Sequence, residues 1–399
     1  MTMLKGKKIV LGVTGGIAAY KAAELVRELV RAEAEVHVVM TRSAQAFVTP
    51  LTFQTLSGNK VITELFSLIE ESEIGHISLA DRAEVLVIAP ATANIIGKIA
   101  SGIADDMLTT IVMATRAPVL LAPAMNVHMW ENPICQENIH KLLSRGYHFI
   151  DPESGELACG YEGKGRLAEI PAIVQKIGAL LSPQDLKGET VLVTAGPTEE
   201  PIDPVRFISN RSSGKMGFSL ARAAARRGAE VLLVSGPCGL AFPPGVKGIR
   251  VQTAAEMRDA VLGTLEKSSI LVMAAAVSDY RPSERSPEKI KKSSGNLVVN
   301  LELNPDILAE AGKRKGNCFM VGFAAETENL LQNARRKLAE KNLDLIVAND
   351  VSQPGAGFQV DTNIAKLIEP GGRIEELPLM GKEDLADVVF DRILEMRKR

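Results

Sequence analysis

The sequence predicts an α/β protein made of two doubly wound domains, each with a mainly parallel sheet covered by helices. Short apolar runs alternate with amphipathic helical patterns along the whole chain, which is the pattern of consecutive βαβ units. The chain has 399 residues, more than one hydrophobic core usually organises. The two halves also begin alike, with a strand, a turn containing Thr and Gly, a helix and a second strand.

In the first half, apolar runs bounded by turn residues mark the strands. They are Lys8–Val13, Glu35–Met40, Val85–Ala89, Val119–Ala122 and Tyr147–Ile150. Amphipathic stretches between the runs predict helices, for example Ala18–Arg31 and Asn132–Ser144.

The pattern restarts after a polar stretch at 181–188, which is typical of a linker. We therefore expect one domain over residues 1–185 and a second over 186–399. The expected strands of the second domain are Thr190–Thr194, Glu230–Ser235, Ile270–Ala275, Cys318–Phe323 and Leu343–Ala348. Ligands of such folds bind at the carboxyl ends of the strands, so the residues after each strand are the candidate site residues.

The composition excludes several classes of protein. A formal net charge of -2 gives no electrostatic reason to expect a nucleic acid or membrane partner. We find no apolar run of about 18 residues and no signal peptide, and therefore expect no membrane span. The 4 cysteines form neither a Cys-x-x-Cys pair nor a metal-like cluster. We expect a cytoplasmic protein.

The turn after the first strand contains Gly15 and Gly16 and leads into a helix. Adjacent glycines let a ligand approach the backbone, and a helix N-terminus favours a phosphate. A dinucleotide site would need Gly-x-Gly-x-x-Gly and an acidic residue at the end of the second strand. That strand instead ends with Thr41, Arg42 and Ser43. The turn therefore favours a phosphate-ended mononucleotide over NAD(P), with an unliganded tight turn as the alternative.

Three further segments accompany this turn: Gly75-His76-Ile77-Ser78-Leu79, Pro90-Ala91-Thr92-Ala93-Asn94, and Pro123-Ala124-Met125-Asn126 followed by Met129-Trp130. Together with the Gly-Gly turn they resemble the flavin-containing cysteine decarboxylases. The resemblance implies a flavodoxin-like domain in which FMN is bound by Gly15, Gly16, Ile17, Thr41, Ser43, Thr92, Ala93 and Asn94. It also implies that His76 is essential for catalysis. Met125 and Asn126 would bind the substrate, with Asn126 on its carboxylate.

Cys159 lies in a segment rich in glycine and charged residues, 155–166. A free cysteine is most often a small buried hydrophobe, but this composition is unlike a core strand. The resemblance implies a flap whose cysteine donates a proton. In the implied reaction the substrate thiol is oxidised to a thioaldehyde, carbon dioxide is lost, and the resulting enethiolate is protonated. A thiol is a suitable acid for that last step.

In the second half, the segment 196–217 combines hydroxyls, glycines and cations ahead of a helix. This composition suits an anionic ligand, although the spacing is not that of a P-loop. A solvated surface turn is the alternative.

Downstream lie Ala274–Pro282, a Lys-rich stretch at 288–295, Asn304–Leu308 and Val321–Thr327. This ordered set resembles the phosphopantothenate–cysteine ligases over residues 188–399 and implies a doubly wound, nucleotide-binding ligase domain. The implied CTP site comprises Ala275, Asp279, Lys289, Pro305, Asp306, Ile307, Leu308, Phe323, Lys337 and Lys341. Lys289 would also be catalytic, while Arg206 and Asn210 would act on the acyl group.

The implied ligase reaction is attack of a 4'-phosphopantothenate carboxylate on the α-phosphorus of CTP, followed by displacement of CMP by cysteine. Mg²⁺ or Mn²⁺ would be held mainly by the CTP phosphates, and the sequence identifies no direct metal ligands. The ligase product, 4'-phosphopantothenoylcysteine, is the substrate of the implied decarboxylase. The two Rossmann-like domains would therefore catalyse consecutive steps of coenzyme A biosynthesis.

Two other functions are compatible with parts of the pattern. One is an NAD(P)-dependent oxidoreductase, which the missing ribose-binding acid disfavours. The other is a non-catalytic, flavin-binding regulatory protein, which the presence of His76, Asn126 and Cys159 disfavours. The resemblance also implies a homo-oligomer, a dodecamer of decarboxylase trimers and ligase dimers, whose other partners are its small-molecule substrates.

Overall fold

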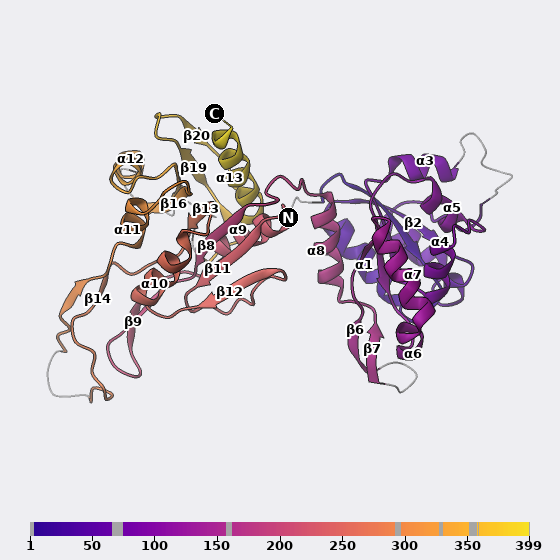
Figure 1. The fold of residues 1–399 in the computed structure, drawn as a ribbon, viewed down its shortest axis with the longest axis horizontal. Coiled ribbons are helices and arrows are strands. Elements are labelled where there is room, and N and C mark those ends of the chain that lie inside the picture. The colour runs from indigo at the N-terminus through magenta and orange to yellow at the C-terminus, as the bar shows by residue number, and fades with distance from the viewer. Residues whose placement is uncertain are drawn as a thin grey trace. The chain divides into compact units, whose positions relative to one another are not determined.

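The structure is a computed structural model. It describes residues 4–65, 75–156, 162–291, 297–326, 330–350, 357 and 359–398. The chain divides into two compact units, Met1–Pro183 and Gln184–Arg399 (Figure 1). Both units contain a mainly parallel sheet with helices on its two faces, so the expected doubly wound α/β fold is confirmed. Within the described residues, no helix combines the length and apolar character needed to cross a membrane.

The sheet of unit 1 is parallel throughout, in the order β2-β1-β3-β4-β5. Its strands are β1 (Lys8–Val13), β2 (Glu35–Met40), β3 (Val85–Ala91), β4 (Val119–Pro123) and β5 (His148–Phe149). This is the flavodoxin-like order, in which the chain reverses direction across the sheet between β1 and β3. The ligand crevice of such sheets lies at that reversal.

Helices cover both faces of this sheet. One face carries α1 (Ala19–Arg31), α2 (Pro50–Ser57) and α8 (Ile170–Leu181). The other carries α3 (Gly75–Arg82), α4 (Ala93–Ala100), α5 (Met107–Ala114) and α7 (Pro133–Ser144). The remaining elements are the short helices η1 (Ala44–Ala46) and α6 (Val127–Glu131) and the hairpin of β6 (Glu153–Glu156) and β7 (Glu162–Arg166).

The sheet of unit 2 has the order β12-β11-β8-β13-β16-β17-β19-β20. Its parallel strands are β8 (Thr190–Ala195), β11 (Glu230–Ser235), β12 (Val246–Arg250), β13 (Ile270–Met273), β16 (Phe319–Glu326) and β17 (Leu345–Asp350). The antiparallel strands β19 (Ala365–Ile368) and β20 (Ile374–Glu376) extend one edge. The parallel part has the dinucleotide-fold order, with its reversal between β8 and β13.

The helices of unit 2 are again divided between the two faces. One face carries α9 (Lys215–Arg226) and α13 (Lys382–Arg397). The other carries α10 (Ala254–Leu265), α11 (Ile307–Lys313) and α12 (Leu330–Glu340). Three small antiparallel pairs complete the unit: β9 (Glu199–Pro201) with β10 (Phe207–Ser209), β14 (Tyr280–Pro282) with β15 (Leu301–Leu303), and β18 (Thr362–Asn363) with β21 (Met380–Gly381).

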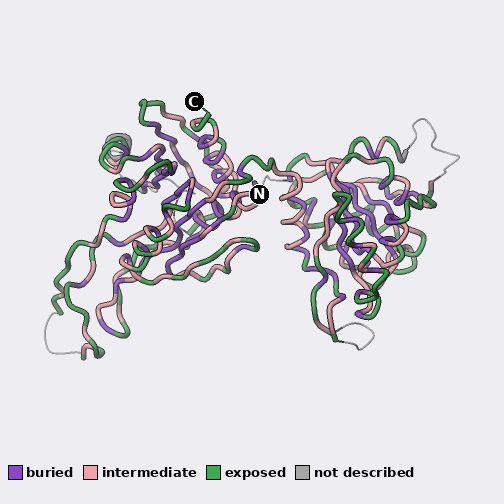
Figure 2. The backbone as a smooth tube through the Cα atoms, in the orientation of Figure 1, coloured by how far each residue is buried: buried purple, intermediate pink, exposed green. Residues whose placement is uncertain are grey.

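The cores lie on the two faces of each sheet, and the central strands are almost wholly buried (Figure 2). Burial on both faces explains why these strands read as continuous apolar runs rather than alternating ones. The expected strand Ile270–Ala275 is shorter in the structure and ends at Met273. Beyond it, the amide of Ala275 donates to the hydroxyl of Thr194 (3.1 Å) instead of to a neighbouring strand. The chain thereby leaves the sheet at its carboxyl edge.

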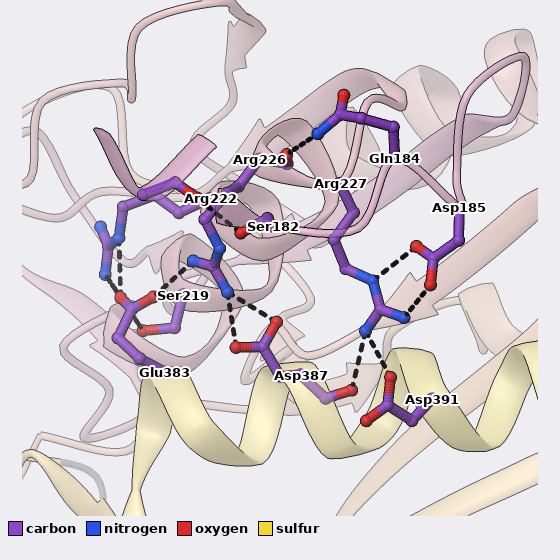
Figure 3. A network of polar contacts seen from close by, with 11 residues as sticks. Ser182, Gln184, Asp185, Ser219, Arg222, Arg226, Arg227, Glu383, Asp387 and Asp391 are labelled. Carbon is purple, nitrogen blue, oxygen red and sulfur yellow. Dashed lines mark hydrogen bonds and ion pairs between the residues drawn. The ribbon is translucent and has the colours of Figure 1, made fainter. Parts of the chain in front are cut away.

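An ion-pair network joins α9 to α13 and to the start of unit 2 (Figure 3). The Arg227 guanidinium, whose side chain is 3% exposed, donates to both oxygens of Asp185 (2.9 and 2.7 Å) and pairs with Asp391 (2.7 Å). Two further arginines pair with acids of α13, Arg226 with Asp387 and Arg222 with Glu383. The network therefore anchors residue 185, just before β8, to the two helices of one face.

Candidate functional sites

A cavity of about 660 Å³ lies at the carboxyl edge of the unit 1 sheet. It is lined by residues after β1, β3 and β4 and by the end of β7 with the residue that follows it. Six of the residues predicted from the sequence contribute to this lining: Gly15, Gly16, Ile17, Thr92, Met125 and Asn126. The cavity therefore lies at the reversal between β1 and β3, where a doubly wound sheet binds its ligand.

The turn between β1 and α1 is shaped for close backbone approach. A Cβ atom at Gly15 would lie 2.3 Å from the Cβ of Ser43, so any larger residue would force the turns after β1 and β2 apart. A Cβ atom at Gly16 would find no atom nearer than 3.8 Å. No side chain caps the N-terminus of α1 at Ala18. A helix start of this kind, beside two glycines, fits the phosphate of a mononucleotide.

Thr14 links this turn to the one after β3. Its hydroxyl donates to the carbonyl of Pro90 (2.6 Å) and accepts from the amide of Thr92 (3.2 Å). Thr92 in turn caps α4 by accepting from the amide of Ile95 (3.4 Å). The amide of Thr41 donates to Val13 (3.1 Å), which brings the end of β2 to the same edge.

Four of the predicted FMN residues do not line the cavity: Thr41, Ser43, Ala93 and Asn94. The first two lie at the end of β2 and the last two in the first turn of α4. Three of them are nevertheless neighbours of the lining, Ser43 through Gly15 and the α4 pair through Thr92.

Met125 and Asn126 close the cavity on the side of β4. The Asn126 side chain accepts from the amide of His128 (2.8 Å) and so caps α6. The amide of Met125 donates to the carbonyl of Gly165 (3.0 Å), which joins this side to the end of β7. His76 belongs to α3, but its side chain lies outside the described residues, as does Cys159 entirely.

Unit 2 contains a cavity of about 790 Å³ at the carboxyl edge of its own sheet. The predicted residues that line it are Asn210, Ala275, Asp279, Pro305, Asp306, Ile307, Leu308, Phe323, Lys337 and Lys341. The tertiary fold thus brings together segments that are widely separated in the chain. Lys289 and Arg206 are absent from the described lining.

Hydrogen bonds hold several of these lining residues in place. The Asn210 amide donates to the carbonyls of Ala276 (3.2 Å) and Val277 (3.0 Å). Asp306 caps α11 by accepting from Ala309 (3.0 Å) and pairs with Lys341 (2.9 Å). Burial opposes the charge of Asp306, but the Ala309 amide and the Lys341 ammonium outweigh it and lower the pKa of this carboxyl. The Asp306 carboxyl is therefore ionised at neutral pH.

Four buried oxygen atoms in the lining have no hydrogen-bond partner among the described residues. They are Ser278 Oγ, Asn304 Oδ1, Asn349 Oδ1 and Asn363 Oδ1. A buried polar atom without a partner costs about 1–3 kcal/mol, and such atoms usually find a partner. Their concentration in one cavity fits a polar ligand such as a nucleotide and its co-substrates.

Sequence reasoning missed Asn349, Asn363 and Lys382 of this lining. Asn349 directly follows the expected strand Leu343–Ala348, so its position at a strand end was a usable signal. Asn363 and Lys382 belong to β18 and α13, and no pattern in the sequence places them at the same edge.

The buried Asp203 holds Arg206 and the segment of Lys289 together. Its carboxylate accepts from the amides of Val205 (2.8 Å), Arg206 (2.8 Å) and Ile290 (3.2 Å) and pairs with the Arg206 guanidinium (2.7 Å). Burial disfavours the charge, but these donors outweigh it and lower the pKa of Asp203 to about 2. Asp203 is therefore ionised at neutral pH. Its hydrogen bond from the Ile290 amide fixes the residue next to the exposed Lys289.

In the part of the chain that the structure describes, no group of three or more His, Cys, Asp or Glu side chains could hold a metal ion.

Each unit matches a protein-family model. Residues 1–182 match the Flavoprotein family, and residues 186–396 match the DNA/pantothenate metabolism flavoprotein C-terminal domain. The whole chain is 50% identical to the coenzyme A biosynthesis bifunctional protein CoaBC of Bacillus subtilis (strain 168), covering 100% of this chain and 99% of that protein. It is 49% identical to the protein of the same name from Escherichia coli (strain K12), covering 98% and 97%.

Among solved structures, the C-terminal domain of a coenzyme A biosynthesis bifunctional protein CoaBC is 41% identical to this chain. The match covers 53% of this chain and 99% of that one, with a TM-score of 0.47.

Proposed function

The chain belongs to the family of bifunctional coenzyme A biosynthesis proteins, and we propose that its two units catalyse consecutive reactions at the two cavities. Unit 2 ligates cysteine to 4'-phosphopantothenate with CTP, and unit 1 decarboxylates the product to 4'-phosphopantetheine with FMN. The observation that carries the proposal is that each unit has one such cavity at the reversal of its sheet, lined by residues of the corresponding family motifs.

In the ligase reaction, a carboxylate oxygen of 4'-phosphopantothenate attacks the α-phosphorus of CTP, and pyrophosphate leaves. The amine of cysteine then attacks the acyl carbon, CMP leaves with the bonding electron pair, and the nitrogen releases a proton to water. Lys337 and Lys341 supply positive charge to the nucleotide, and Asn210 positions the acyl group. Mg²⁺ or Mn²⁺ would neutralise the phosphates.

In the decarboxylase reaction, bound FMN supplies a two-electron oxidation and its reversal. The turn of Gly15 and Gly16 with the start of α1 holds the cofactor phosphate. Asn126 binds the substrate carboxylate, and His76 and Cys159 complete the catalytic groups, with Cys159 as the proton donor. Thiols suit this role because an ordinary pKa of about 8.5 lets them give up a proton close to neutral pH.

The active form is proposed to be a cytoplasmic homo-oligomer, a dodecamer. Large apolar side chains in the lining of the unit 1 cavity support an oligomer, because Ile17 is 61% exposed and Tyr20 60% exposed in the single chain. Exposed apolar patches of this kind commonly mark protein interfaces.

The purified protein tests the function directly. We expect visible flavin absorption, CTP- and 4'-phosphopantothenate-dependent release of pyrophosphate, and cysteine-dependent formation of 4'-phosphopantetheine by mass spectrometry. A colourless protein that consumes NAD(P)H would indicate the oxidoreductase instead. A yellow protein without pyrophosphate release would indicate the non-catalytic flavin-binding protein.

A further inference from the structure

One wall of the unit 2 cavity consists of residues that the proposed nucleotide site does not use. They are Asn349 at the end of β17, Asn363 on β18 and Lys382 at the start of α13. β18 pairs with β21, which directly precedes α13, and this register places Asn363 opposite Met380. Asn349 lies opposite Ala365, two residues beyond Asn363. The three side chains therefore come from adjacent backbone segments.

The two asparagines present hydrogen-bond acceptors without partners. Asn363 is 3% exposed and Asn349 8% exposed, and the Oδ1 atom of each has no partner among the described residues. The Asn363 amide nitrogen donates only weakly, to the sulfur of Met216 at 3.7 Å. A ligand that offers N–H donors at this wall would satisfy both oxygens.

Lys382 adds a buried positive charge to the same wall. Its residue is 5% exposed, and its ammonium donates to the carbonyls of Gly357 (3.0 Å) and Val360. None of the described carboxylates lies within ion-pair distance of it. Burial, and then the nearby Lys215, lower the pKa of Lys382 to about 8, while Asp361 partly offsets this. A buried cation of this kind is stabilised by an anionic ligand group.

An amino acid carries an amine and a carboxylate on one carbon atom. The two amide oxygens can accept hydrogen bonds from the amine, and the buried lysine can pair with the carboxylate. We propose that Asn349, Asn363 and Lys382 form the subsite for the cysteine substrate, with its carboxylate on Lys382 and its amine on the two amide oxygens. This inference rests on the proposed ligase function. A neutral amine that donates two N–H bonds keeps its lone pair available for the acyl carbon.

A phosphate group fits this wall less well. Phosphate oxygens are acceptors, and the unpartnered Oδ1 atoms of Asn349 and Asn363 would face them without a donor between. The nucleotide-facing cations, Lys337 and Lys341, belong to the opposite face of the sheet, on and just after α12. The cavity thus offers separate walls to the nucleotide and to the amino acid.

Substitutions in the full chain test the subsite. Lys382→Met, Asn349→Leu and Asn363→Leu roughly keep side-chain size and remove the polar group that each residue would offer to the amino acid. We expect each to raise the KM for cysteine about 10- to 100-fold. Pyrophosphate release without cysteine should stay unchanged, so the acyl-cytidylate accumulates. Lys366→Met is the matched control, because Lys366 pairs with Glu376 on the neighbouring β19–β20 pair and is not in the described lining.

Cysteamine, which lacks the carboxylate, separates the two contacts. Lys382→Met should raise the KM for cysteine but not for cysteamine, and Lys382→Arg should restore most of the preference for cysteine. Asn363→Leu should raise the KM for both acceptors, and it also tests the subsite if Lys382→Met fails to fold.

An unchanged KM for cysteine in all three variants would overturn the subsite. A selective increase in the KM for CTP or 4'-phosphopantothenate would also overturn it and assign the wall to a phosphate. Failure of the proposed function itself is distinguishable, because the wild-type protein would then release no pyrophosphate at all.

Discussion

Gly15 lies where the turns after β1 and β2 approach each other most closely. Its missing side chain leaves room for Ser43, whose backbone carbonyl carbon would lie 2.8 Å from an added Cβ atom. Backbone atoms cannot rotate away as a flexible side chain can. An added Cβ atom at residue 15 would therefore displace the phosphate-binding turn itself.

Gly15→Ala should therefore weaken flavin binding about tenfold or more, since overpacking of this kind typically costs about 1–3 kcal/mol. The ratio of flavin to protein absorbance after gel filtration measures this. Gly97→Ala in α4 is the control, because an added Cβ there meets nothing nearer than 3.8 Å. Equal flavin content in both variants would contradict the proposed role of the turn.

The two ligase half-reactions need different groups. Lys289 is proposed to act in the activation of the acid, and Asn210 in the transfer to cysteine. Removing a cation that stabilises the transition state costs about 2.7–4 kcal/mol, roughly 100- to 1000-fold in rate. Lys289→Gln should suppress pyrophosphate release and form no acyl-cytidylate. Asn210→Asp should still activate the acid but accumulate the intermediate after cysteine is added, as mass spectrometry would detect. The reverse pattern would show that the two roles are wrongly assigned.

At the scale of elements, the position of α13 depends on charged side chains of α9. The partners of Arg227 are themselves part-exposed, Asp185 by 36% and Asp391 by 67%. Solvent therefore screens these ion pairs, and each contributes less to the free energy of unfolding than a fully buried pair would. The main consequence is that loss of Arg227 leaves two carboxylates without their shared partner.

Arg227→Met should destabilise unit 2 by about 2–3 kcal/mol and lower its Tm by about 5–10 °C, as followed by circular dichroism. Arg258→Met removes a pair with Glu310 in which the arginine side chain is 34% exposed, against 3% for Arg227. It should cost less than about 1 kcal/mol. Equal losses in both variants would contradict a special role for Arg227.

The destabilisation caused by Arg227→Met should become smaller in acid. The hydrogen bond from Arg227 lowers the pKa of Asp185. A carboxyl whose pKa is lowered by folding stabilises the fold above its unfolded-state pKa, about 3.9, and loses that contribution as the pH falls through its folded-state pKa. The Tm difference between Arg227→Met and the wild type should therefore shrink as the pH falls below about 4. A difference that grows in acid would contradict this linkage.

At the scale of the whole molecule, the two units have separate cores. The two unit 1 clusters extend no further than Leu181, and the two unit 2 clusters begin at Leu186. Each unit also has its own sheet and its own cavity. No strand or core cluster among the described residues is shared between them.

Fragments 1–185 and 186–399 should therefore fold separately. We expect the first to be a yellow protein that decarboxylates added 4'-phosphopantothenoylcysteine, and the second to release pyrophosphate from CTP with 4'-phosphopantothenate. Absorption spectra and pyrophosphate assays on the separate fragments measure this. A colourless or insoluble first fragment would argue against the boundary.

The sequence by itself determined the parallel strands of both sheets, except β12, and the turns at their carboxyl ends. Apolar periodicity and turn residues are local properties, so Lys8–Val13, Glu35–Met40 and Glu230–Ser235 have the predicted bounds. The Gly15–Gly16 turn could be predicted for the same reason. A pair of adjacent glycines is a local feature of the sequence that indicates a turn open to a ligand.

Only the tertiary structure decided which distant side chains share a cavity. Asn349, Asn363 and Lys382 meet because an antiparallel extension of the sheet returns the chain to the edge where β17 ends. Their burial, with the Oδ1 atoms of both asparagines left without a partner among the described residues, is equally invisible in the sequence. Asparagine and lysine are ordinarily surface residues. The physical reason is that burial and charge compensation depend on contacts between segments far apart in the chain. The periodicity of apolar residues reflects only local secondary structure.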